Sequence, residues 1–182
     1  MIMTVEELRK FVDTDESDEC LAAKLAGIEQ QIRGYTNNNF QVRGTGIVAD
    51  VVAGVFMSEA LIPYEAGDTI QISGSAKNDG LYTVNEVTDD TTFTVNEKTR
   101  DDIDCYITLV RYPADVKMGV ANMMTWEKEN RTKAGIQSET ISRHTVNYIN
   151  LDAWNSALGY PASLVQFLKP YMKGRFGRGI GR

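Results

Sequence analysis

The sequence has few of the residues on which metal and disulfide chemistry depends. Its 182 residues include 2 cysteines and 1 histidine. Cys20 and Cys105 are far apart and lack the spacing of zinc ligands, so neither a zinc site nor a disulfide framework is expected. Two free thiols suit a reducing compartment. We therefore expect no metal and no other cofactor.

The sequence motifs of common enzyme classes are also missing. The chain contains no HExxH, GxSxG or GxxxxGK[ST] pattern. The acidic pairs at 89–90 and 101–102 fall in turn-like segments, where aspartate is a common turn former. His144 is interpreted as a surface or interface residue rather than a general base. The sequence therefore favours a protein that is not an enzyme and has no catalytic residues.

No stretch of the chain has the composition of a secretory signal or a membrane span. The first residues lack a basic region followed by an apolar one. The most apolar window, 47–66, contains Asp50, Glu59 and Glu65, and a bilayer would oppose the burial of these acids. We therefore expect a protein that stays inside the cell and does not enter a membrane.

The chain does have an ordinary globular composition, with an uneven distribution of charge. It is 42% hydrophobic and 24% charged, which indicates one large domain or two small ones. Residues 1–110 carry 8 basic and 20 acidic side chains, whereas residues 111–182 carry 11 basic and 5 acidic ones. Such a dipolar subunit is suited to binding copies of itself or an acidic partner. A solvated surface without a partner would show the same pattern.

The N-terminal part of the sequence predicts two helices. Thr4 and Glu7 form a capping box that starts the first helix. The segment 13–17 ends it and supplies the N-cap of the second helix. An apolar stripe predicts that this second helix packs against other helices, and it consists of Leu21, Leu25, Ile28, Ile32 and Tyr35. The polar run 36–39 ends the second helix.

Between residues 41 and 111 the helical period gives way to alternation, which predicts an inserted β-domain. The strand candidates are 47–55, 69–72, 81–87, 92–95 and 103–110. In the last of them, one face is expected to contain Ile103, Cys105, Ile107 and Leu109. Five short strands favour a small barrel, for which we expect an SH3-like architecture.

Helical spacing resumes after Tyr112, so we expect residues 1–40 and 112–182 to form a helical core that carries the inserted domain. The segment from about 135 to 150 is polar and β-prone, and predicts an extended arm or an edge strand. Its candidate subunit-interface residues are Ser138, Glu139, Ile141, Arg143 and His144. A last helix begins near Pro161, and Pro170 is expected to end or kink it. The predicted fold class is α+β, a bundle of about four helices with an inserted five-stranded barrel and an extended arm.

The C-terminal tail, 173–182, contains four glycines and no acidic residue. Arginines with an interleaved phenylalanine bind either the phosphates and bases of a nucleic acid or the surface of a protein. Because the chain as a whole is acidic, nucleic acid is disfavoured as the main ligand. We favour a protein partner, and the candidate partner-binding residues are Lys169, Lys173, Arg175, Phe176, Arg178 and Arg182.

Taken together, these segments resemble the head-to-tail connector proteins of long-tailed bacteriophages, also called adaptor or head-completion proteins. The likeness covers nearly the whole chain and includes the order of its elements. Its sequence segments are TNNNF (36–40), GDTIQISGS (67–75), NDGLYTV (78–84), RYPADV (111–116) and GIQSETIS (135–142). The inserted β-domain departs from the simplest helical members of that family.

The resemblance implies a structural virion protein that forms a ring, typically a dodecamer, between the portal of the capsid and the tail. Its expected partners are the portal protein, neighbouring copies, and a stopper or tail-completion protein, with genomic DNA passing through the ring without sequence-specific binding. Its expected location is the capsid–tail junction, after assembly in the host cytoplasm. The alternative is a small nucleic-acid-binding protein that uses an SH3-like or OB-like barrel and the Gly/Arg tail. A phage hydrolase is a third hypothesis, disfavoured by the scarcity of histidine.

Overall fold

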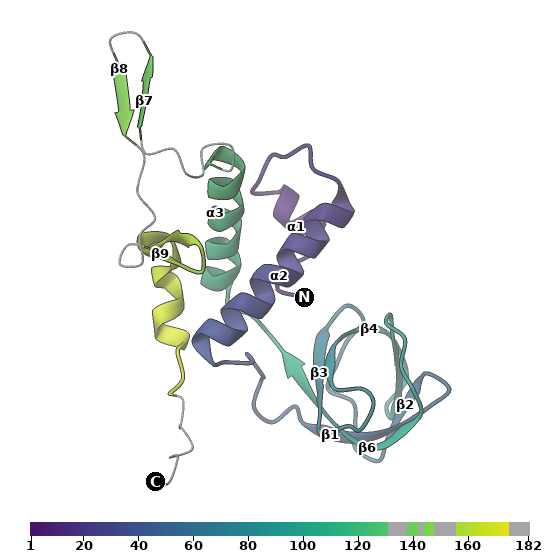
Figure 1. Cartoon of the computed structure of the whole chain (residues 1–182). Coiled ribbons are helices and arrows are strands. Elements are labelled where there is room, and N and C mark those ends of the chain that lie inside the picture. Colours follow the sequence, from purple (N-terminus) through teal and green to yellow (C-terminus); the bar gives the residue numbers. More distant parts are fainter. Residues whose placement is uncertain (131–137, 142–143, 148–155, 175–182) are drawn as a thin grey trace. The chain divides into compact units, whose positions relative to one another are not determined.

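The chain divides into two compact units in a computed structural model that describes residues 1–130, 138–141, 144–147 and 156–174 (Figure 1). One unit comprises Met1 and Asn39–Tyr112, and the other comprises Ile2–Asn38 and Pro113–Arg182. The first unit contains a β-barrel and the second contains the helices, so the fold class is α+β. The segment 41–111, expected to be an inserted domain, lies within the barrel unit.

Both predicted N-terminal helices are capped as the sequence indicates. Before α1 (Val5–Arg9), the Thr4 hydroxyl accepts a hydrogen bond from the Glu7 amide at 3.0 Å. The Glu7 carboxylate accepts one from the Thr4 amide at 3.2 Å, which completes the capping box. Before α2 (Asp18–Thr36), the Ser17 hydroxyl accepts a hydrogen bond from a backbone amide of the first turn. Both predicted helix starts are confirmed.

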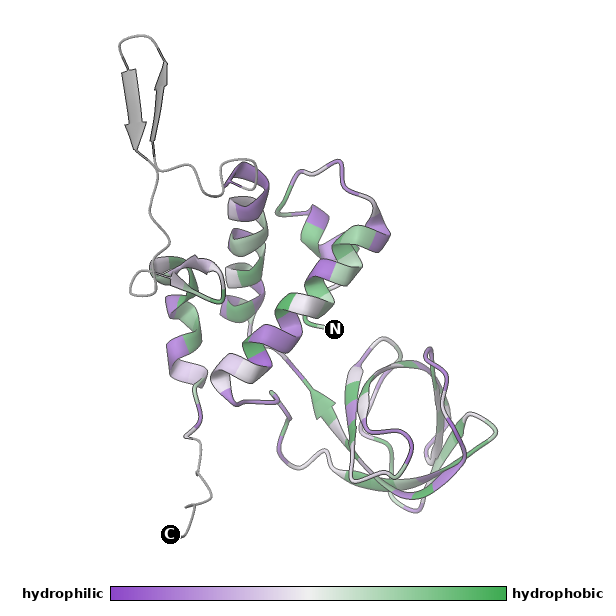
Figure 2. Cartoon of the chain, in the orientation of Figure 1, coloured by the Kyte–Doolittle hydropathy of each residue, from purple (hydrophilic) through white to green (hydrophobic). Residues whose placement is uncertain are grey.

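The apolar stripe of α2 faces the interior of the helical unit. Four of its five predicted members are at most 5% exposed, namely Leu21, Leu25, Ile28 and Ile32. Tyr35, the last member, is half-buried. The helix ends before Asn37, which adopts a left-handed conformation with φ of 50°. Figure 2 shows the alternation of apolar and polar residues along α2 that this one-sided burial requires.

The helical unit also contains α3 (Ala114–Asn130) and the 3₁₀ helix η2 (Ala162–Tyr171). α3 has a buried inner face that includes Val116, Val120, Met123 and Met124. A last helix was expected from about Pro161, and η2 begins at Ala162 as a 3₁₀ helix and ends at Tyr171, one residue after Pro170. No helix within the described residues is long and apolar enough to span a membrane.

α3 and η2 approach each other closely at one glycine. The ring of Phe167 lies directly over Gly119, so closely that a Cβ atom at Gly119 would overlap it. Phe167 belongs to η2 and Gly119 to the buried face of α3. The absence of a side chain at Gly119 therefore sets the distance between these two elements.

The barrel has six antiparallel strands rather than the expected five. In the order β1-β2-β5-β4-β3-β6 it closes on itself, and its strands are β1 (Ile47–Val52), β2 (Val55–Ser58), β3 (Thr69–Ser73), β4 (Gly80–Asp89), β5 (Thr92–Val95) and β6 (Asp102–Val110). The additional strand arises because the candidate 47–55 is interrupted at Ala53 and Gly54, with φ of 51° and 84°. These two residues form the turn of a β1–β2 hairpin in which Val52 pairs with Val55.

Aromatic and aliphatic side chains fill the barrel. The rings of Phe56 and Phe93 stack with their centroids 4.7 Å apart, and Tyr64 packs edge-on against Phe93 at 5.8 Å. Both phenylalanines are fully buried. This aromatic cluster gives the barrel unit a hydrophobic core of its own.

One prediction for β6 is wrong. Ile103 was expected to share the inner face of the strand with Cys105, Ile107 and Leu109. Those three residues are at most 4% exposed, but Ile103 is 69% exposed. The register with β1 is irregular between Asp102 and Cys105, where Asp104 has φ of 54°. This bulge reverses the alternation and turns Ile103 outward.

The chain enters and leaves the barrel at adjacent points. The Arg111 amide donates to the Phe40 carbonyl oxygen at 3.0 Å, and the Val42 amide donates to the Leu109 carbonyl oxygen at 2.8 Å. The rings of Phe40 and Tyr112 also pack together, with centroids 4.7 Å apart. The two ends of the inserted segment are therefore joined at its base.

Two short antiparallel hairpins follow α3 in the sequence. β7 (Ser138–Ile141) pairs with β8 (His144–Asn147), and β9 (Ser156–Ala157) pairs with β10 (Tyr160–Pro161). The sequence predicted an extended arm or an edge strand at about 135–150. The described residues of that segment form a two-stranded antiparallel sheet.

Candidate functional site

The segment 171–174, from which the basic tail continues, is fastened to the C-terminal end of α2. The Lys173 amide donates to the Thr36 carbonyl oxygen at 2.8 Å. The side-chain nitrogens of Asn37 and Asn38 donate to carbonyl oxygens of the segment at 3.2 and 3.1 Å. The residues that end α2 thus also hold the C-terminal part of the chain, and we call this arrangement the C-terminal anchor.

A side chain of the same segment reaches α3. The Tyr171 hydroxyl lies 2.8 Å from both carboxylate oxygens of Asp115, to which it donates a hydrogen bond. This hydrogen bond raises the pKa of Tyr171, so the hydroxyl keeps its proton and its role as donor. Through Tyr171 the C-terminal anchor is tied to α3 as well as to α2.

The predicted partner-binding residues begin at this anchor. Lys169 lies in the last turn of η2, where a positive charge complements the helix dipole. Lys173 follows four residues later, and both lysines are exposed. The other four predicted residues lie outside the described part of the chain, namely Arg175, Phe176, Arg178 and Arg182.

Most of the predicted subunit-interface residues belong to one small sheet. Ser138, Glu139 and Ile141 are in β7, and His144 is in β8. Ile141 is paired with His144 in the backbone register. The fifth predicted residue, Arg143, lies outside the described residues. The structure thus brings four of the five positions into one hairpin.

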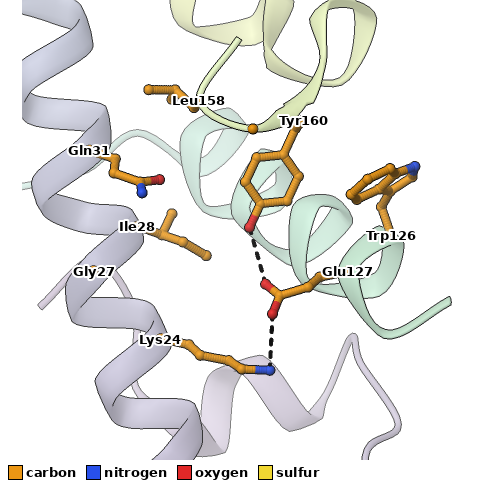
Figure 3. Close-up of a pocket in the computed structure, with 9 residues that line it drawn as sticks. Lys24, Gly27, Ile28, Gln31, Trp126, Glu127, Leu158 and Tyr160 are labelled. Carbon is orange, nitrogen blue, oxygen red and sulfur yellow. Dashed lines mark hydrogen bonds and ion pairs between the residues drawn. The ribbon is translucent and has the colours of Figure 1, made fainter. Parts of the chain in front are cut away.

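An open pocket of about 330 Å³ lies in the helical unit (Figure 3). α2 supplies Lys24 and Ile28 to its lining, α3 supplies Trp126 and Glu127, and β10 supplies Tyr160. Lys24 Nζ lies 3.2 Å from a carboxylate oxygen of Glu127, whose other oxygen accepts a hydrogen bond from the Tyr160 hydroxyl at 3.2 Å. This polar chain links three elements across the pocket.

Electrostatics fix the protonation of the two donors in this chain. Burial opposes the charge of Lys24, but hydrogen bonds to Glu16 and Glu127 outweigh it and raise the lysine pKa. Burial and the nearby Glu127 carboxylate raise the pKa of Tyr160 to about 12. Both groups therefore keep their protons at neutral pH, which suits a structural link between α2, α3 and β10.

Three of the four aspartates in the acidic pairs of the barrel accept hydrogen bonds in its turns, which agrees with the turn-forming role expected of them. The Asp89 carboxylate accepts hydrogen bonds from the Thr91 amide and hydroxyl at 2.8 and 2.9 Å. Asp101 accepts one from the Ala53 amide at 2.8 Å. The Asp102 carboxylate accepts one from a serine hydroxyl at 2.6 Å, and this bond holds the Asp102 pKa below its usual value. These carboxylates stabilise loop conformations.

The C-terminal anchor contains functional candidates that sequence reasoning missed. Asn37 and Asn38 were interpreted only as residues that end a helix, a task for which one asparagine suffices. The run of three asparagines at 37–39 was the available signal.

Within the described residues, no three His, Cys, Asp or Glu side chains gather in the manner of metal ligands.

Comparison with known proteins adds no family assignment. The sequence matches no protein-family model, and no curated protein matches it significantly.

Proposed function

We propose that this protein is a structural ring adaptor between the portal of a bacteriophage capsid and the tail, which completes the head and allows DNA to pass. The C-terminal anchor is the observation that carries this proposal. It fixes the chain up to Gly174 through Asn37, Asn38 and Asp115. A basic tail that starts from a fixed point is suited to reaching another polypeptide.

The distribution of charge supports a ring of identical subunits. The barrel segment, 39–112, has 12 acidic and 5 basic side chains, whereas residues 113–182 have 5 acidic and 10 basic ones. In a closed ring each copy presents one surface to its neighbour on either side, and opposite charges favour such head-to-tail contacts. We propose a dodecamer in which the β7–β8 residues and Arg143 form part of the contact between subunits.

The remaining partners follow from this role. The portal lies on one side of the ring and a stopper or tail-completion protein on the other, and Lys169, Lys173 and the tail bind a protein partner within this assembly. Genomic DNA passes through without sequence-specific binding, and the acidic charge of the barrel disfavours contact with phosphate. The protein takes no part in a reaction and resides at the capsid–tail junction after assembly in the host cytoplasm.

The antiparallel meander β3-β4-β5 supports our proposal that the barrel is SH3-like.

Electron microscopy of the protein mixed with its cognate portal tests the proposal. We expect a ring of density on the narrow end of the portal. Single copies scattered on the portal, or no binding to it, would refute the ring adaptor. Retention of duplex DNA by the isolated chain, decreasing steeply with salt, would favour a nucleic-acid-binding protein instead.

The tail provides a second test of the same function. Deletion of residues 173–182 should leave a folded protein and weaken its capture by immobilised portal. Each exposed ion pair contributes only about 0 to 1 kcal/mol, but a ring multiplies the contacts. A variant that keeps the length of the tail, R175Q/R178Q/R182Q, should lose capture to a similar extent, whereas K98Q in the barrel should not. Unchanged capture of the deletion variant would contradict this role of the tail.

A further inference from the structure

The outer face of the barrel at β1 carries an unusual number of exposed apolar side chains. Burial alternates along β1, so Val48, Asp50 and Val52 all face outward. The register pairs Val48 with Tyr106 of β6, and Asp50 with Met57 of β2. The four apolar residues of this group are each 43 to 50% exposed.

The bulge in β6 adds another apolar side chain to this face. It turns Ile103 outward, beside Asp104, whose amide donates to Asp50 Oδ1 at 3.0 Å. We call the resulting surface the β1 patch, and it consists of Val48, Val52, Met57, Ile103 and Tyr106 around Asp50. The patch thus has an acidic residue at its centre and apolar residues around it.

Two features prepare the β1 patch for a cationic partner. Among the described residues, no cationic side chain forms an ion pair with Asp50. The ring of Tyr106 lies over Gly46, where a Cβ atom would overlap it, so close packing restricts the position of the ring. A charge surrounded by apolar side chains attracts an opposite charge more strongly once a partner excludes water.

The closed barrel restricts the way in which a partner can bind. Each of its strands is paired on both sides, so the barrel offers no free edge to which an extended segment could add a strand. A partner must therefore recognise side chains on the outer face. Such a partner presents a segment in which a positive charge lies next to apolar side chains.

We propose that the β1 patch is the docking surface for residues 175–182 of a second copy of this chain. This inference rests on the proposed ring adaptor function and names one of its subunit contacts. The segment RFGRGIGR contains three arginines, Phe176 and Ile180, and no acid. Its composition complements an acidic centre with an apolar rim, and the barrel segment as a whole has an excess of acidic side chains.

The length of the segment and the symmetry of a ring are compatible with this contact. The C-terminal anchor fixes the chain up to Gly174. The eight residues that follow, fully extended, reach at most about 29 Å. A contact between the tail of one copy and the barrel of the next is heterologous, and contacts of that kind generate rings when the rotation closes.

A peptide with the sequence of residues 173–182, labelled for fluorescence anisotropy, tests the proposal with the full-length protein. We expect saturable binding that weakens as salt is raised from about 50 to about 300 mM. The variant D50N keeps the oxygen that accepts from the Asp104 amide but removes the charge, and should weaken binding by about fivefold or more. E86Q removes an exposed acid elsewhere on the barrel and should change the affinity by less than about twofold.

A peptide in which Phe176 and Ile180 are both alanine should also bind less tightly, because the apolar rim would lose its contacts. Absence of saturable binding overturns the proposal. Equal weakening by D50N and E86Q also overturns it, because the barrel would then attract the peptide only through its overall charge.

Photo-crosslinking shows whether the tail binds the barrel of another copy or the barrel of its own chain. A benzophenone amino acid replaces Phe176 in a mixture of isotope-labelled and unlabelled chains. We expect crosslinks to the β1 patch that join labelled to unlabelled chains. Crosslinks confined to single chains would show that the tail binds its own barrel and would overturn the second copy as occupant.

The two proposals fail in different ways. If the protein forms rings on the portal but does not bind the peptide, this inference is wrong and the ring adaptor stands. If the peptide binds the β1 patch but no ring forms on the portal, the ring adaptor is wrong.

Discussion

A single residue in the barrel, Ala53, adopts a backbone conformation that alanine disfavours. It has φ of 51° and precedes Gly54 in the turn between β1 and β2. Asparagine tolerates this conformation well, and Asn-Gly is the preferred sequence for such a turn. We therefore expect A53N to raise the free energy of unfolding by about 1 kcal/mol in urea denaturation.

Another alanine in the same hairpin provides the control. Ala49 lies within β1 and is 2% exposed, so A49G should lower the free energy of unfolding by about 0.5 to 1 kcal/mol. A decrease for both variants would contradict the assignment of the left-handed turn to Ala53.

From the raised pKa of Tyr160 we predict that the free energy of unfolding falls at alkaline pH. Its pKa is raised to about 12, whereas a tyrosine in the unfolded chain titrates near pH 10. The folded chain therefore binds more protons between these values, so this contribution is complete below about pH 10 and is lost as the pH rises towards 12. Urea denaturation at a series of pH values should show the free energy of unfolding falling across this window.

The variant Y160F isolates this contribution. It removes the hydrogen bond to Glu127 and should lower the free energy of unfolding at neutral pH by about 1 to 2 kcal/mol. Its free energy of unfolding should also decline less steeply between about pH 10 and 12, because one raised tyrosine pKa is gone. Identical slopes for Y160F and the wild type would refute the assignment.

At the scale of the element, the close approach of α3 and η2 reverses the usual effect of a helical substitution. Replacement of glycine by alanine within a helix ordinarily stabilises it by about 1 kcal/mol. At Gly119 the new Cβ atom would overlap the ring of Phe167, so G119A should instead lower the free energy of unfolding by about 1 to 3 kcal/mol.

A second glycine in a helix serves as the matched control. Gly27 of α2 has nothing within 4 Å of the position of a Cβ atom, so G27A should stabilise the protein. The double variant G119A/F167L should recover part of the loss, because leucine can move away from the new methyl group. Thermal melting of the variants checks all three expectations, and stabilisation by G119A would exclude the close contact.

The elements predicted from the sequence are those whose signals are local. The capping box at Thr4 and the stripe from Leu21 to Ile32 depend on residues three or four positions apart, and both are confirmed. The division of 47–55 into two strands was missed because Ala53 gives no signal for a turn. The outward position of Ile103 was missed because a bulge depends on pairing with a distant strand.

The candidate site also contains features with a local sequence signal and features that depend on distant contacts. The basic character of the C-terminal region is visible in the sequence, and Lys169 and Lys173 are indeed exposed. The C-terminal anchor could not be predicted, because Asn37 and Asn38 reach carbonyl oxygens more than 130 positions away in the sequence. Contacts over such separations depend on tertiary packing and leave no periodic pattern.

At the scale of the whole molecule, the barrel is an insertion whose ends meet. Because Phe40 and Arg111 are joined by a backbone hydrogen bond, a linker of about four residues can replace residues 42–109. We expect the shortened chain to retain its helical circular dichroism and to melt cooperatively, since the helical unit has its own buried core.

A core substitution controls for helix that persists without tertiary packing. Leu25 is fully buried in α2, so L25D should abolish cooperative melting in the shortened chain. Loss of both the helical signal and the cooperative transition in the shortened chain itself would mean that the helical unit needs the barrel to fold.

The joined ends of the barrel also determine how it responds to tension. The hydrogen bonds at its base link neighbouring antiparallel segments, from Arg111–Phe40 to Val42–Leu109, and they lie across the direction of the chain. Opposite pulls on Phe40 and Arg111 stress these bonds one after another, as in a zipper, whereas a shearing pull would stress them together. Stretching the backbone across the insertion therefore unzips the barrel from its base at low force.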